Sequence, residues 1–137
     1  MSQTDQARGT TGLGRVLVAL YGVFAIAAVS RASVQIATRF HEAPLAYVLS
    51  ALAGLVYVVA TVGLGRTGRR WRTVAWVACS VELLGVLTVG TLSLADARAF
   101  PDSTVWSAYG RGYGFVPLVL PVLGLVYLRS ERRRGRA

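Results

Sequence analysis

The chain has 137 residues, of which 54% are hydrophobic and 15% are charged. A water-soluble domain of this length normally carries more charge, so the composition excludes an ordinary soluble fold and favours the lipid bilayer as the solvent. The single cysteine, Cys79, lies in an apolar segment, which excludes an intramolecular disulfide, a C-x-x-C redox pair and a thiolate metal site. The chain is therefore held together by packing alone.

The net charge is +9, and all fifteen basic residues are arginine, with no lysine or asparagine. This bias is typical of a GC-rich genome, and we expect an actinobacterial source. A strongly basic soluble protein would suggest a nucleic-acid partner. Here the arginines lie between apolar runs, and no RNP, zinc-finger or helix-turn-helix pattern accompanies them. We therefore expect anionic lipid headgroups, and no nucleic acid, as the partner of these charges.

Four apolar segments follow a polar, unpatterned lead-in at 1–12, which we expect to be a disordered cytoplasmic N-terminus. The predicted spans are residues 13–30, 44–64, 73–95 and 105–128. A spanning helix needs roughly 20 residues to cross a hydrocarbon layer of about 30 Å. The uninterrupted apolar part of the fourth span, 115–128, is only about 21 Å long as a helix, so the span must also include residues 109–114. The sequence predicts an all-α, transmembrane antiparallel four-helix bundle over 13–128, followed by a basic cytoplasmic tail at 129–137.

The placement of arginine predicts the orientation, because positively charged loops stay in the cytoplasm. Eleven arginines lie before the first span, between the second and third, or after the fourth: Arg8, Arg15, Arg66, Arg69, Arg70, Arg72, Arg129, Arg132, Arg133, Arg134 and Arg136. The other two connections hold four. We therefore expect a multi-pass protein of the bacterial plasma membrane with both termini in the cytoplasm.

A signal peptide is an alternative interpretation of the first segment. Arg8 and Arg15 precede an apolar core at 16–27, and Ala-Val-Ser at 28–30 has the small residues of a cleavage site. The apolar run is somewhat long for a signal peptide, and three further spans follow it. An intact first helix is the favoured interpretation.

Glu82 is the one carboxylate deep inside an apolar span, about 14 Å from the cytoplasmic end of its helix. Tyr21 and Tyr57 lie at similar depths, about 12 Å and 10 Å from the same side. Because buried polar groups require partners, we predict a cluster of these three residues in the bundle core. The cluster can be a hydrogen-bonded latch between helices or a proton site in a carrier.

Arg31, Gln35 and Arg39 follow the first span at a spacing of four residues, which places them on one face if the helix continues. This face predicts an anchor at the outer headgroups, or a site for an anionic headgroup or substrate held by two guanidinium groups. Arg111 is a further candidate contact for such an anion.

Aromatic residues mark the segment before the fourth span. If Asp102 caps a helix that starts near Ser103, then Trp106, Tyr109 and Tyr113 share one face. We expect these rings to form an aromatic belt at the outer interface, with a ring-lined pocket contacted by Asp102 and Arg111 as the alternative.

Gly110 and Gly114 have the small-x-x-x-small spacing that permits close helix approach. Pro117 and Pro121 each remove a backbone donor and predict a kink in the fourth helix.

Catalytic motifs are missing from the sequence. There is no nucleophile with a matching base, no phosphate-binding glycine loop and no paired metal-ligand set, and His41 has no second histidine at ligand spacing. We therefore expect no enzyme activity, no cofactor and no metal site.

Two runs carry a resemblance to known proteins: F-P-D-S-T-V-W-S-x-Y-G-x-G-Y-G-F-V-P-L-V-L-P-x-x-G-L from Phe100, and A-P-L-A-Y-V-L-S from Ala43. With them, most of the chain resembles a family of small four-span integral membrane proteins of actinobacteria that lack an assigned activity. The resemblance implies a fold and a location but no chemistry.

Three functions fit these patterns. The first is an integral membrane protein that works by helix packing, as a homo-oligomer or as an accessory or scaffolding subunit of an envelope complex. The second is a proton-coupled carrier of a small or lipid-like solute, centred on Glu82. The third is a module that binds anionic lipid.

Overall fold

Three long helices and a broken fourth element make up the fold. The computed structural model describes residues 2–96, 98, 100, 104 and 106–136. In chain order the elements are α1 (Ser2–Arg39), the 3-10 turn η1 (Phe40–Glu42), α2 (Pro44–Gly65), α3 (Arg69–Ala95), the 3-10 segment η3 (Ser107–Tyr113) and α4 (Val116–Arg136). The described residues contain no strand, and the predicted all-α class is confirmed.

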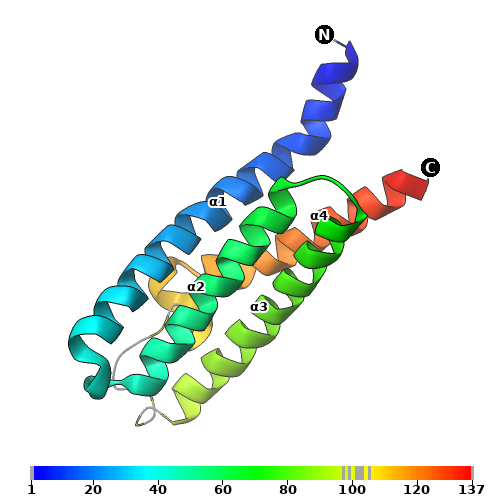
Figure 1. The fold of residues 1–137 in the computed structure, drawn as a ribbon. Helices are drawn as coiled ribbons and strands as arrows, with labels where there is room; N and C mark the ends of the chain where they lie inside the picture. Colours follow the sequence, from blue (N-terminus) through cyan, green and yellow to red (C-terminus); the bar gives the residue numbers. More distant parts are fainter. Residues whose placement is uncertain (1, 97, 99, 101–103, 105, 137) are drawn as a thin grey trace.

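The helices run antiparallel because their connections are short. Pro44 lies in the first turn of α2, where its missing N–H costs no hydrogen bond, and Gly68 allows the turn into α3 with a φ of 111°. The two termini and the α2–α3 connection lie at one end of the bundle, and η1 lies at the other (Figure 1). The three arginine-rich segments of the sequence are thus gathered at one end.

The helices extend further than the sequence predicts. α1 begins at Ser2 and not near Leu13, and α4 continues through the basic tail to Arg136. The lead-in at 1–12, predicted as disordered, is helical from Ser2, and the basic tail continues α4. A helix that is already nucleated gains one hydrogen bond for each added residue, so it can continue through polar sequence without an apolar stripe.

Membrane character is visible in the surface of the bundle. α1, α2 and α3 are each long and apolar enough to cross a membrane, and η3 with α4 makes a fourth span if the bent pair counts as one. Large apolar side chains such as Ile26, Leu55 and Leu84 are exposed, whereas Glu82 and the tyrosines 21 and 57 are fully buried. Apolar residues outside and polar residues inside are the arrangement that a lipid solvent favours.

The fourth span is broken, which corrects the predicted helix at 105–128. η3 and α4 meet at an angle of 100°. Ala108, Tyr109 and Phe115 have positive φ values of 49°, 62° and 61°, as do two glycines, so the backbone leaves the helical region before α4 begins. The apolar part of α4, residues 116–128, is about 20 Å long and does not cross the hydrocarbon layer alone.

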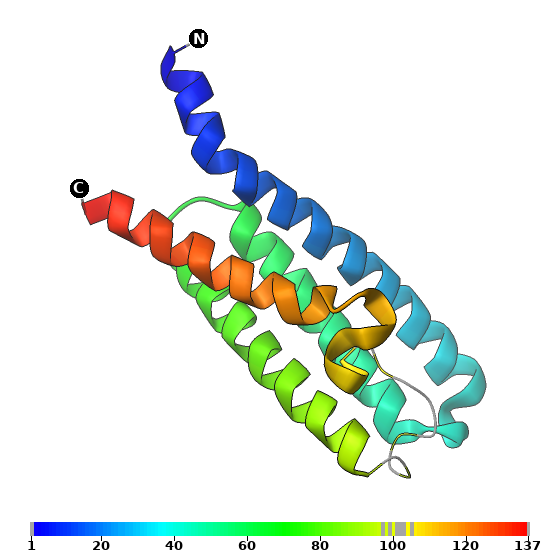
Figure 2. The same cartoon turned by 180° about the vertical axis from the view of Figure 1, so that it is seen from behind.

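The unwound backbone is satisfied by nearby groups. The N–H of Ala108 donates to Ser93 Oγ of α3 at 2.8 Å, and the N–H of Phe115 donates to the carbonyl of Gly110 at 3.0 Å. Irregular backbone at membrane depth is tolerated when it is buried in protein and hydrogen-bonded in this way. The segment packs against α3 and the start of α4, on the face of the bundle that Figure 2 turns toward the reader.

Candidate functional site

Glu82 and Tyr21 form a direct hydrogen bond across the bundle. Glu82 of α3 and Tyr21 of α1 are both 0% exposed, and the Tyr21 hydroxyl donates to Glu82 Oε1 at 2.5 Å. The Tyr21 oxygen also lies 3.6 Å from the sulfur of Cys79, one turn before Glu82. Within the described part of the chain, Glu82 Oε2 has no hydrogen-bond partner. The pair links α1 to α3 at mid-depth and leaves one carboxyl oxygen available.

Tyr57 joins this cluster through its ring and not through its hydroxyl. Its ring centre lies 6.1 Å from that of Tyr21. Its hydroxyl accepts a hydrogen bond from Trp106 Nε1 at 3.0 Å. The structure therefore brings together all three residues predicted from depth, and adds Trp106 and Cys79. Equal depth identified the first three, but only the break in the fourth span brings Trp106 into the core.

The three outer aromatic residues do not share a helical face, which corrects the predicted belt. Trp106 is 2% exposed and its ring lies against Gly85 of α3. Tyr109 packs against Gly90, and its hydroxyl lies 2.9 Å from Thr91 Oγ1. Tyr113 turns the other way, toward α1. The left-handed residues between these rings send them in different directions, so helical spacing does not apply.

Tyr113 connects the core to the face of α1 that carries the arginine series. Its ring centre is 5.8 Å from that of Phe24, and its hydroxyl accepts a hydrogen bond from Arg31 Nη1 at 2.5 Å. α1 remains helical to Arg39, so Arg31, Gln35 and Arg39 do lie on one face, in a shallow depression. Gln35 is buried, which a purely interfacial anchor would not require.

The remaining predicted contacts are dispersed. Arg39 forms an ion pair of 3.7 Å with Glu42, and Arg111 is exposed on η3. Asp102, predicted as a helix cap and pocket residue, lies outside the described residues. The described chain brings no three His, Cys, Asp or Glu side chains together in a metal-binding group.

The bend of the fourth span precedes both prolines. Pro117 lies in the first turn of α4, where no helical hydrogen bond is lost, whereas Pro121 lies inside the helix. Gly110 and Gly114 are turn residues with φ values of 82° and 63°, and not the helix-contact pair that their spacing suggests. A Cβ on Gly110 would lie 2.8 Å from the Pro117 ring, so the chain needs glycine there for both reasons.

A double-mutant cycle tests the Tyr21–Glu82 hydrogen bond. We expect Tyr21→Phe and Glu82→Leu to show a coupling energy of about 1 kcal/mol in the free energy of unfolding, because intramembrane hydrogen bonds contribute amounts of this order and leucine has no acceptor for the Tyr21 hydroxyl. Reversible unfolding in lipid bicelles measures it. Tyr57→Phe is the matched control: the Tyr57 hydroxyl accepts from Trp106, so the effect of this variant should add to that of Glu82→Leu without coupling. Coupling for the control pair but none for Tyr21 would contradict this geometry.

The fold and the buried polar core define an all-helical membrane protein. No protein-family model, curated protein or solved structure matches this chain. Any function assigned to it therefore depends on the contacts described above.

Proposed function

We propose that this chain is a multi-pass protein of a bacterial plasma membrane that works by helix packing, as an accessory or scaffolding subunit of an envelope complex. The observation that carries the proposal is the Tyr21–Glu82 hydrogen bond between α1 and α3. Glu82 is fully buried, and it lines neither the depression on α1 nor the cavity at the arginine-rich end of the bundle. An ionisable group held in this way fixes the relative position of two helices.

The distribution of residues supports a partner in the membrane. Connections are short, with η1 and residue 43 joining α1 to α2, and residues 66–68 joining α2 to α3. Nearly all described residues therefore belong to the bundle, and a partner can contact it through lipid-facing helix surfaces or through its charged ends. With eleven of the fifteen arginines in segments at one end, we propose that this end is cytoplasmic.

The alternative is a proton-coupled carrier, and one observation favours it. Glu82 Oε2 lacks a hydrogen-bond partner among the described residues. Side chains in contact lead outward from it through Tyr21, Tyr57, Phe24 and Tyr113 to Arg31. A proton on Glu82 could be exchanged for a solute along such a row if water or solute entered between the rings.

One experiment separates these functions. The full chain is extracted from native membranes in copolymer nanodiscs, and the same chain and Glu82→Gln are reconstituted in liposomes with an imposed pH gradient. We expect a stoichiometric protein partner in the nanodiscs and no proton flux above empty liposomes for either form. A partner-free chain with a flux that Glu82→Gln removes, while the variant keeps its helical content, would support the carrier and refute the subunit role.

A further inference from the structure

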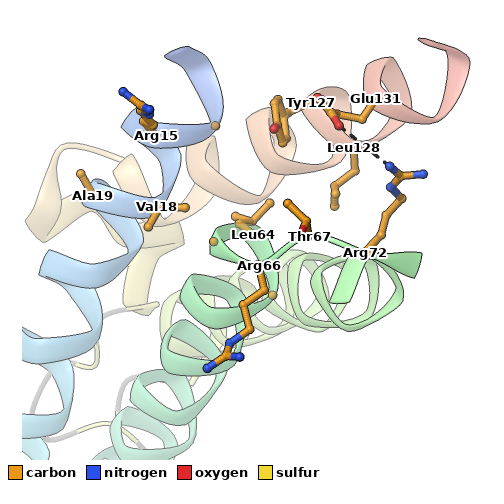
Figure 3. Close-up of a pocket in the computed structure, with 14 residues that line it drawn as sticks. Arg15, Val18, Ala19, Leu64, Arg66, Thr67, Arg72, Tyr127, Leu128 and Glu131 are labelled. Carbon is orange, nitrogen blue, oxygen red and sulfur yellow. Dashed lines mark ion pairs between the residues drawn. The ribbon is translucent and has the colours of Figure 1, made fainter. Parts of the chain in front are cut away.

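A cavity of about 600 Å³ opens at the arginine-rich end of the bundle. It lies between the N-terminal half of α1, the α2–α3 connection and the C-terminal half of α4 (Figure 3). α1 packs mainly against α2 and makes few contacts with α4, so the bundle has an open seam between its first and last helices. The cavity has the size of a typical small-molecule site.

The walls of this cavity are apolar and its rim is basic. Val18 of α1, Leu64 of α2 and Leu128 of α4 face into it in Figure 3, and Ala19 lies at its edge. The rim residues are polar: Arg15, Arg66, Thr67, Arg72, Tyr127 and Glu131. The rim therefore carries three arginines and one carboxylate, which is a net positive charge. An apolar pocket with a cationic rim, at the end of a membrane bundle, fits a molecule with a lipid tail and an anionic head.

Arg72 is the rim arginine that is best placed to bind an anion, because the Arg15 side chain points away from the cavity in Figure 3. Arg15 has no ionic or hydrogen-bond partner within the described residues. Arg72 is held by Glu131, but Nη2 and Oε2 are 3.9 Å apart, which is a long and weak ion pair. Arg66 contributes its stem, because its guanidinium stacks on Trp71 at 5.0 Å and points away from the cavity (Figure 3).

The seam is closed at one point by a small residue. A Cβ on Gly14 would lie 2.6 Å from the Tyr127 hydroxyl oxygen, so α1 and α4 meet there through glycine. Away from this contact, the apolar walls of α1 and α4 extend to the lipid-facing surface, where Leu20 and Val126 are exposed. An acyl chain can therefore enter the cavity sideways from the bilayer while its headgroup stays at the rim.

We propose that this cavity binds a phospholipid with net negative charge, with its headgroup phosphate at Arg72 on the rim and an acyl chain along the seam between α1 and α4. Guanidinium groups hold phosphate through paired, charge-assisted hydrogen bonds. Glu131 competes with the phosphate for Arg72. This site depends neither on a protein partner nor on Glu82, so it goes beyond the proposed function and is tested separately.

The test uses the purified full-length chain in uncharged detergent micelles, titrated with fluorescent phosphatidylglycerol and, in parallel, fluorescent phosphatidylcholine. We expect phosphatidylglycerol to bind about tenfold more tightly, the factor that one charge-assisted contact supplies. Arg72→Gln should weaken phosphatidylglycerol binding by about tenfold, and Glu131→Gln should strengthen it, because the competing carboxylate is removed. A general loss of folding would weaken binding in both variants, so it cannot explain weaker binding in one variant and stronger binding in the other.

Ala19→Phe fills the cavity without a change in charge and should abolish binding. Matched variants at the other end of the bundle supply the controls. Ala37→Phe, at an exposed position near the opposite end of the same helix, should leave binding unchanged. Arg98→Gln removes the same charge as Arg72→Gln and should leave affinity unchanged.

Several outcomes would overturn the proposal. They include equal binding of the two lipids, equal weakening by Arg98→Gln and Arg72→Gln, and full competition by free glycerol phosphate at the concentration of the lipid. The last outcome would assign the rim to a soluble anion. Binding that survives Ala19→Phe would also contradict an acyl chain in the seam.

Discussion

Replacing Trp106 by alanine is expected to lower the free energy of unfolding by about 3 kcal/mol, the low end of the range for a buried tryptophan. The indole is 2% exposed, donates its N–H to Tyr57, and lies edge-on to the Tyr57 ring at 6.4 Å. Lipid solvates apolar groups as well as the core does, so the loss comes from packing, the cavity and the hydrogen bond rather than from transfer to water. Reversible unfolding in lipid bicelles measures it.

Trp71→Ala is the matched control for this variant. Trp71 lies at the start of α3, is partly exposed, and contacts Arg66 through its ring face. Its removal should cost about 1 kcal/mol or less, as for an exposed cation–π contact. Equal losses for the two tryptophans would show that Trp106 is an interfacial belt residue and not a core residue.

Gly63→Ala is expected to destabilise the bundle by about 2 kcal/mol, within the range for overpacking. A Cβ at Gly63 would lie 2.9 Å from the backbone nitrogen of Ala75 and 3.1 Å from its Cα. Backbone atoms of α3 cannot yield as a side chain can, so α2 and α3 would have to separate. The helix preference of alanine over glycine, about 1 kcal/mol at most, opposes this loss but does not cancel it.

Gly22→Ala is the same substitution at an open position of α1. The nearest atom to its added Cβ would be Thr61 Cγ2 at 3.8 Å, an ordinary contact. This variant should be neutral or slightly more stable by thermal unfolding in the same bicelles. The prediction fails if the two glycine variants unfold alike, because close approach of α2 and α3 would then play no part in stability.

The depth of polar residues in apolar spans was sufficient to predict the core pair. Each apolar run marks a helix, the rise per residue gives the depth of each side chain, and a buried acid needs a partner. These rules predict that Tyr21 and Glu82 lie in the core. They do not predict which tyrosine hydroxyl bonds to Glu82, because helix rotation and neighbouring donors decide that. In the structure Tyr21 bonds to Glu82, and the Tyr57 hydroxyl accepts from Trp106.

The broken fourth span could not be predicted from local preference. Alanine and tyrosine rarely adopt a positive φ, yet Ala108 and Tyr109 do so here. Tertiary contacts stabilise this backbone, with Ser93 accepting the hydrogen bond from Ala108 and with Gly85 and Gly90 leaving room for the rings of Trp106 and Tyr109. The glycines at 110, 112 and 114, before a short apolar run, are a signal for irregular structure, but their spacing was interpreted as a helix contact.

The cavity at the arginine-rich end could also not be predicted from the sequence. Its lining comes from three separate segments, 14–19, 63–72 and 127–131, and the sequence analysis interpreted the arginines among them as topology signals. The family resemblance stays a prediction, as do the orientation and the source.

The short apolar part of α4 has a consequence for how the chain enters the membrane during synthesis. This part, residues 116–128, is below the roughly 17 residues that the shortest independent spans contain. The rings of Trp106 and Tyr109, which precede this helix, pack onto α3. That surface of α3 is present only once α3 is already inserted. Membrane insertion must then proceed in order. The last quarter of the protein enters the lipid only after α1, α2 and α3 are inserted, because it depends on contacts with them.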